Sequence, residues 1–66
     1  MQIPNLPPPI PTGQIKSLGP YGPEYEVGHM SRRLEDGDWL VEITLIRTSE
    51  RAEYRLSNIF KDPEAH

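Results

Sequence analysis

Three carboxylates gather within four residues of this chain, at Glu35, Asp36 and Asp38. Carboxylate oxygens are the ligands that calcium prefers, but the segment lacks the spacing and length of a twelve-residue calcium loop. The same side chains form a negative patch that suits a basic protein partner. Asp36-Gly37 also favours a tight hairpin turn, because both residue types tolerate positive φ. The sequence therefore predicts a solvated acidic hairpin over residues 35–38, with a role in partner binding and no metal or other cofactor.

His29 is the one histidine inside the patterned part of the chain. As a general base it would need a nucleophile or a water molecule, and a third group to orient it. Ser31 lies two residues away and Tyr54 lies on a later segment, and this arrangement has no triad signature. We therefore expect His29 to be a partly buried structural residue, and we expect the protein not to be an enzyme.

Two apolar residues, Leu40 and Ile46, fall on the face of a predicted strand that is opposite to Val41 and Ile43. Apolar side chains exposed among charges mark interaction sites more often than chance. The alternatives are that the proline-rich tail or the C-terminal helical turn covers this face, or that the strand bends enough to bury both of its faces. With the acidic hairpin and the intervening glutamate, these residues form the predicted partner-binding set: Glu35, Asp36, Asp38, Leu40, Glu42 and Ile46.

Apolar residues at every second position predict the strands that carry these side chains. Trp39, Val41 and Ile43 indicate a strand over residues 39–47, and Tyr25 and Val27 indicate another over residues 24–32. Further strands are expected over residues 52–56 and, from a shorter pattern, over residues 13–18. Gly28 within a strand predicts a β-bulge or bend.

A short helical turn is expected after the last strand, over residues 58–61. Ser57 has the side chain to cap it, and Asp62-Pro63 ends it. This turn would place Ile59 and Phe60 against the end of a barrel. The whole predicted core is Ile15, Leu18, Tyr25, Val27, Leu34, Trp39, Val41, Ile43, Leu45, Tyr54, Leu56, Ile59 and Phe60.

These elements predict an all-β fold, a small antiparallel meander with an SH3-like curved sheet or barrel. Five of the eight prolines lie in residues 1–13, so this stretch is expected to be a disordered, flexible proline-rich tail. Residues 14–62 form the small β domain, and residues 63–66 form a frayed C-terminus. In 66 residues the core is marginal, so a partner or a second copy of the chain would stabilise it.

The charge of the chain disfavours nucleic acid as the partner. The net charge is −3, and residues 21–66 carry ten acidic side chains against six basic ones. Phosphate binding needs clustered lysine and arginine. The chain has no cysteine, no apolar run of the roughly 20 residues that span a membrane, and no signal-peptide pattern at its start. We therefore expect a cytoplasmic protein with no contact to membranes.

The motifs GPEYEV at residues 22–27, DGD at residues 36–38 and DPEA at residues 62–65 resemble a family of small uncharacterised bacterial proteins, filed as a domain of unknown function. The strand at residues 41–45 and the turn at residues 48–50 match as well, with Ser49 where the family pattern favours glycine. The resemblance covers about 45 residues. It implies a bacterial or mobile-element origin, and its motifs carry fold and no catalytic residue.

These observations lead to one main hypothesis on function and two alternatives. The main hypothesis is a non-enzymatic protein-binding module, regulatory, antitoxin-like or inhibitory, that acts through the acidic hairpin and the outer strand face. Reversing Glu35, Asp36 and Asp38 to lysine is then expected to abolish binding and leave the fold intact. One alternative is a phage-type inhibitor of a host defence nuclease, with acidic side chains that mimic phosphates. The other is a small nucleic-acid-binding barrel, which rests on fold analogy.

Overall fold

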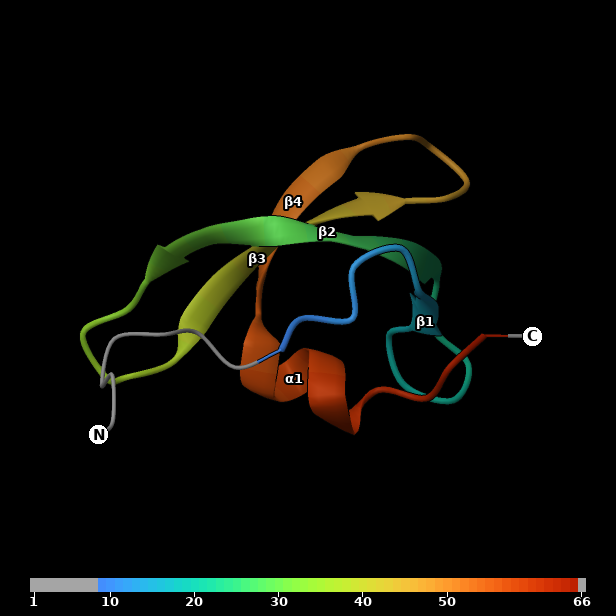
Figure 1. Ribbon diagram of the computed structural model, residues 1–66. Helices are drawn as coiled ribbons and strands as arrows, with labels where there is room; N and C mark the ends of the chain where they lie inside the picture. The colour runs from blue at the N-terminus through green and yellow to red at the C-terminus, as the bar shows by residue number, and fades with distance from the viewer. Residues whose placement is uncertain (1–8, 66) are drawn as a thin grey trace.

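Four antiparallel strands and one short helix make up the fold, in the order β1 (Ile15–Ser17), β2 (Glu24–Arg33), β3 (Trp39–Leu45), β4 (Arg51–Arg55) and α1 (Leu56–Lys61). The computed structural model describes residues 9–65. Each strand pairs with the next along the chain, so the sheet is a meander in the order β1-β2-β3-β4 (Figure 1). The predicted all-β antiparallel meander with a short C-terminal helix is confirmed. Residues 1–8 of the predicted disordered tail, which spans residues 1–13, lie outside the described residues.

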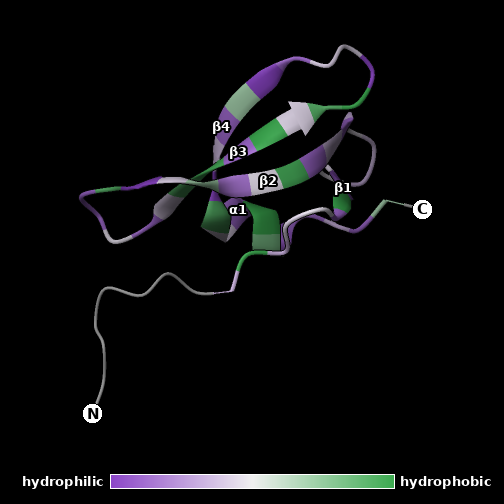
Figure 2. Cartoon of the chain, turned by 45° about the horizontal axis from the view of Figure 1, so that its top comes forward, coloured by the Kyte–Doolittle hydropathy of each residue, from purple (hydrophilic) through white to green (hydrophobic). Residues whose placement is uncertain are grey.

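Helix α1 packs on one face of the sheet, and the core lies between them (Figure 1). Figure 2 shows the alternation of hydrophilic and hydrophobic residues along β2 and β3 that produces this one-sided burial. Leu56 and Ile59 are three positions apart on one side of α1, so both reach the sheet. Phe60 points away and is 54% exposed, so its predicted place in the core is wrong. The buried apolar residues are Tyr25, Val27, Val41, Ile43, Leu56 and Ile59.

A bulge in β2 confirms the prediction made from Gly28. Val27 lies opposite Ile43 and Met30 lies opposite Val41, so two residues of β2 face the single residue between them on β3. A Cβ on Gly28 would lie 2.7 Å from the carbonyl oxygen of Glu42, so only glycine fits. His29 is the other bulged residue. It is exposed, which corrects the prediction of a partly buried histidine, because the bulge breaks the alternation that pointed it inward.

Both ends of the domain hydrogen-bond to the sheet. The amide of Gly13 donates to the carbonyl of Val27 at 2.8 Å, and Ile10 packs against the core. At the other end, the amide of Ala65 donates to the carbonyl of Ile15 at 2.9 Å, on the side of β1 that β2 leaves open. Residues 13 and 65, which the sequence assigns to the flexible tail and the frayed end, therefore both hydrogen-bond to backbone groups of the sheet.

Asp62 organises a polar cluster beneath the sheet, which we call the Asp62 cluster (Lys16, Tyr25, Tyr54 and Asp62). The Oδ2 atom of Asp62 accepts hydrogen bonds from the hydroxyls of Tyr25 at 2.7 Å and Tyr54 at 3.0 Å. The buried Lys16 Nζ donates to the carbonyls of Ile59 at 2.6 Å and Asp62 at 3.2 Å, at the C-terminal end of α1. Burial and the Asp62 carboxylate raise the pKa of Tyr25 well above its ordinary value. The cluster ties β1, β2, β4 and the end of α1 together.

Candidate partner-binding surface

The acidic hairpin forms the turn between β2 and β3, as predicted. The amide of Leu34 donates to the carbonyl of Asp38 at 2.8 Å, and the amide of Gly37 donates to the carbonyl of Leu34 at 3.1 Å. Gly37 has a φ of 91°, in the left-handed region that glycine enters without strain. The Asp36-Gly37 dipeptide therefore sets the turn that presents the carboxylates.

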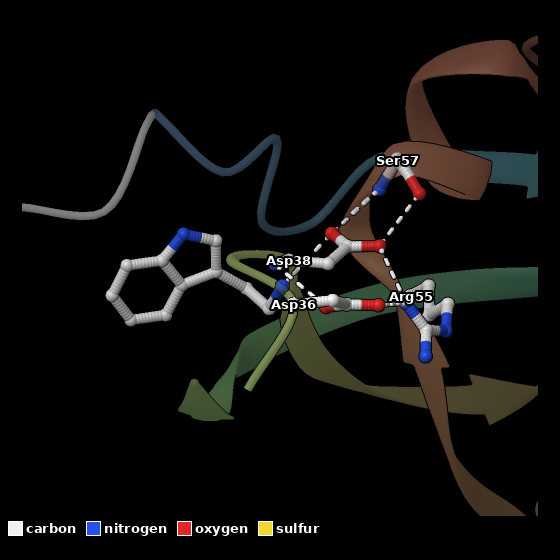
Figure 3. A network of polar contacts seen from close by, with 5 residues as sticks. Asp36, Asp38, Arg55 and Ser57 are labelled. Atoms are coloured by element: carbon white, nitrogen blue, oxygen red, sulfur yellow. Dashed lines mark hydrogen bonds and ion pairs between the residues drawn. The ribbon is translucent and has the colours of Figure 1, made fainter. Parts of the chain in front are cut away.

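Two of the three hairpin carboxylates bind residues of the same chain (Figure 3). Asp36 Oδ2 lies 2.6 Å from Arg55 Nη1, and Asp38 Oδ2 lies 3.4 Å from the same nitrogen. Asp38 Oδ2 also accepts the Ser57 hydroxyl at 2.7 Å, while Oδ1 accepts the backbone amides of Trp39 and Ser57. We call Asp36, Asp38, Arg55 and Ser57 the hairpin network. It fastens the β2–β3 turn to the junction of β4 and α1.

The hairpin network corrects two expectations. Ser57 does not cap the helix, because α1 already begins at Leu56 after Arg55, which makes no side-chain cap, and the Ser57 hydroxyl is directed to Asp38. Replacing Glu35, Asp36 and Asp38 with lysine would also break these internal bonds. We therefore no longer expect that variant to keep the fold intact. The Arg55 guanidinium holds the pKa of Asp36 below its usual value, and the Ser57 hydroxyl does so for the pKa of Asp38.

Glu35 is an exposed member of the acidic hairpin, as is Asp36, whereas Asp38 is half-buried. Glu35 borders a shallow hollow of about 380 Å³ whose other lining residues are Arg32, Arg33, Leu34, Asp36 and Arg55. Leu40 lies nearby, since it pairs with Arg32 on β2 and with Arg55 on β4. Leu40 is half-buried, which fits an apolar side chain flanked by the stems of two arginines.

The face of the sheet opposite α1, which we call the outer face, carries carboxylates from three neighbouring strands. Glu42 of β3 pairs directly with Glu53 of β4, and Glu26 of β2 pairs with Thr44, two residues from Glu42. All three glutamates are exposed, and the Ser31 hydroxyl donates to Glu53. We call Glu26, Glu42 and Glu53 the acidic stripe. Of these, only Glu42 belongs to the predicted partner-binding set. Glu26 and Glu53 were not predicted, and the pairing of the strands places them near Glu42.

Ile46 lies at the other end of β3, away from the hairpin. Its amide donates to the carbonyl of Glu24 at 3.0 Å, and its side chain is 44% exposed. Ile46 follows the last residue of β3 and is six positions from Leu40, roughly 20 Å along an extended strand. Ile46 lines an apolar hollow of about 300 Å³ with Ile15, Glu24 and Ala65. The structure thus brings together five members of the predicted set and separates Ile46 from them.

Comparison with known proteins places this fold in a family. Residues 3–66 match the model of a family of unknown function, DUF5397. The chain belongs to this family. A family of unknown function is what the sequence motifs implied. A similar relative is an uncharacterized protein of the bacterium Haemophilus influenzae, 52% identical over 56 residues, which are 85% of this chain and 89% of that protein.

For this family member, the residues considered for catalysis do not converge. The Ser31 hydroxyl is directed to Glu53 on the outer face, whereas the Tyr54 hydroxyl is directed to Asp62 on the helix side. Among residues 9–65, no group of three or more histidine, cysteine or acidic side chains is arranged to hold a metal ion. Within the same residues, none of the helices has the length and apolar character needed to cross a membrane.

The sequence-based reasoning missed the residues that bind the hairpin and the polar cluster beneath the sheet. Arg55 and Ser57 lie about 20 positions from the carboxylates that they contact, and no local pattern connects them. Asp62 gave a partial signal, because it opens the DPEA motif and precedes a proline. The sequence predicts a helix stop at Asp62-Pro63, and the structure adds that the Asp62 carboxylate accepts hydrogen bonds from two tyrosines, one on β2 and one on β4.

Proposed function

We propose that this protein is a non-enzymatic protein-binding module, regulatory, antitoxin-like or inhibitory, that contacts a basic partner through the acidic stripe on its outer face. The observation that carries this proposal is the pairing of Glu42 directly with Glu53. Like charges opposite one another on neighbouring strands destabilise a sheet. A feature that weakens the fold is expected where it serves an interaction.

The charge of the stripe is not compensated within the described residues. The two ion pairs of residues 9–65 both belong to Arg55, and both end on the hairpin aspartates. Glu26, Glu42 and Glu53 therefore have no ion-pair partner in the part of the chain that the structure describes. A partner surface with lysine or arginine would relieve their mutual repulsion and steer the encounter by long-range attraction.

The hairpin supports this surface from one end. Glu35 and Leu40 extend the stripe, with an exposed carboxylate and an apolar contact beside it. Asp36 and Asp38 act differently, because the hairpin network holds the turn in one conformation before any partner arrives. A preformed surface loses less conformational entropy on binding. The cytoplasmic location expected from the composition is part of the same proposal.

A narrower form of the proposal is inhibition of a host defence nuclease. Carboxylates spaced across an open sheet face can occupy positions that nucleic-acid phosphates would take. The alternative of a nucleic-acid-binding barrel has less support, since the acidic stripe would repel a phosphate backbone. A captured partner that binds nucleic acid, and releases it when this protein is added, would favour the narrower form.

The test compares three forms of the protein, each immobilised and exposed to a lysate of the source organism. Glu26→Lys/Glu42→Lys reverses two charges of the stripe and leaves the hairpin network untouched. Glu50→Lys/Glu64→Lys is the matched control, because it changes the net charge equally at exposed positions off the stripe. Circular dichroism establishes that all three are folded.

We expect the wild-type protein and the control to retain the same partner in a salt-sensitive manner. The stripe variant should bind that purified partner at least about tenfold more weakly, a loss typical of reversed charges at an interface. The proposal is refuted if the stripe variant captures the partner as well as the wild type does. It is also refuted if no protein is retained by the control and lost by the stripe variant.

A further inference from the structure

Strand β4 forms one edge of the sheet, and its outer side has no strand beside it within the described residues (Figure 1). The amide of Leu45 donates to the carbonyl of Glu50, so these two form a hydrogen-bonded pair. In an antiparallel ladder such pairs alternate, so Ala52 and Tyr54 direct their backbone groups toward β3. The alternate residues direct their N–H and C=O groups to the free edge: Arg51, Glu53 and Arg55.

Two side chains along this edge, those of Arg51 and Glu53, carry charges that have no ion-pair partner among residues 9–65. Arg51 pairs with Thr44 and has no ion-pair partner among residues 9–65. On the side toward β3, the cross-strand neighbour of Glu53 is Glu42, which carries the same charge. Arg51 and Glu53 are two residues apart and share the outer face. A cation next to Glu53 and an anion next to Arg51 would remove both imbalances.

We propose that a second copy of this chain supplies both charges, by pairing β4 with β4 in an antiparallel arrangement about a two-fold axis at Ala52. Arg51 then lies opposite Glu53 of the partner subunit, and the symmetry creates the same pair a second time. Both are hydrogen-bonded pairs, and each exchanges two backbone hydrogen bonds. The result is a continuous eight-stranded sheet. This inference goes beyond the proposed function, since it concerns the edge of the sheet and a copy of the same chain.

The charges select this register over its neighbours. A two-fold axis at Glu53 would place glutamate against glutamate and Arg51 against Arg55 of the partner subunit, and like charges directly opposite are unfavourable. An axis at Tyr54 would place the start of α1 along the edge and would recruit Arg55, which already binds Asp36. Ala52 suits the axis, because residues of a non-hydrogen-bonded pair approach to about 4.5 Å between Cα atoms.

The contact is small, so the dimer is expected to be weak. In this register residues 51–53 of each β4 lie opposite one another, which is less than a standard protein interface, and the charged edge also resists unspecific pairing. We expect a dissociation constant between about 10 µM and 1 mM. Sedimentation equilibrium over this concentration range measures it directly.

Charge reversal tests both the dimer and its register. Arg51→Glu places glutamate against glutamate in the dimer, and Glu53→Arg places arginine against arginine. Each variant alone should dimerise about tenfold or more weakly than the wild type. An equimolar mixture should recover association, because a chain with glutamate at both positions 51 and 53 then meets a chain with arginine at both positions.

A wild-type protein that stays monomeric up to about 1 mM would overturn the proposal. So would single variants that associate as well as the wild type, or a mixture that associates no better than its components. The side chains of Arg51 and Glu53 are exposed, so both variants should fold, which circular dichroism verifies. Glu26→Lys/Glu42→Lys should still dimerise, so failure of this inference and failure of the proposed function are distinguishable.

Discussion

The Asp62 cluster gives the sharpest prediction for stability. Asp62→Ala removes the acceptor of two tyrosine hydroxyls and keeps the backbone bonds that end α1. Tyr25 is fully buried, so its hydroxyl would lose its partner where water does not reach it. Leaving a buried donor unsatisfied costs about 1–3 kcal/mol. Tyr54 is half-buried and can be hydrated in part, so its loss adds about 1 kcal/mol or less.

The expected total is a loss of about 1–4 kcal/mol in the free energy of unfolding. A chain of 66 residues is typically stable by about 3–10 kcal/mol, so this loss is a large fraction of the whole. Urea denaturation followed by the fluorescence of Trp39, the single tryptophan, measures it. Tyr21→Phe is a control, because the Tyr21 side chain is 99% exposed and should change the unfolding free energy little.

A second substitution separates an unsatisfied hydroxyl from a general packing defect. Asp62→Ala/Tyr25→Phe removes the donor as well as the acceptor, so it should be more stable than Asp62→Ala alone by about 1 kcal/mol or more. If the double variant is equally or less stable, or if Asp62→Ala costs less than about 0.5 kcal/mol, the assigned role of this carboxylate is wrong.

The same cluster predicts a loss of stability in alkaline solution. The pKa of Tyr25 is raised in the folded protein by burial and by Asp62, from an ordinary value of 10.0. A raised folded-state pKa contributes stability that is complete below pH 10 and declines as pH rises above it, because the unfolded chain ionises first. The slope should approach about 1.4 kcal/mol per pH unit, and Tyr25→Phe should reduce it. If the urea midpoints of the wild type and of Tyr25→Phe fall equally steeply with rising pH, this account is wrong.

Three further predictions concern single positions. Ser49 has a φ of 61°, a left-handed conformation that costs a side chain about 1 kcal/mol, so Ser49→Gly should raise the urea midpoint; a lower midpoint would contradict this account. Gly22→Ala should cost at least about 3 kcal/mol or prevent folding, since its Cβ would lie 1.7 Å from the Leu18 carbonyl oxygen; a cooperative transition near that of the wild type would refute the geometry. The pKa of Asp38 is lowered by the Ser57 hydroxyl and then by the Trp39 amide, so this carboxylate stabilises the fold above its ordinary value of 3.8 and loses that effect as pH falls below it. Asp38→Asn should therefore show a flatter decline of urea midpoints between about pH 4 and pH 2, and an unchanged decline would argue against the hairpin network.

The sequence by itself determined the local elements of this protein. Alternation at Trp39, Val41 and Ile43 predicted β3, and the structure ends it two residues before the predicted limit of 47. Gly28 and the Asp36-Gly37 pair predicted the bulge and the turn correctly. Each of these features depends on the backbone preferences of a few adjacent residues, or on which side of one strand is apolar, so a short window of sequence contains the whole signal.

The tertiary structure alone decided which polar groups are satisfied within the chain. Asp36 and Asp38 appear in the sequence as an acidic patch, but Arg55 and Ser57 engage them, and the unbalanced charge lies instead on the acidic stripe. Lys16 is a surface residue by type, yet it is buried at the end of α1, 46 positions from Asp62 in the chain. These contacts arise from the register of neighbouring strands and from the direction in which a six-residue helix crosses the sheet. A charged side chain takes whichever partner the fold brings within hydrogen-bond distance, and that distance is set by the packing of the whole domain.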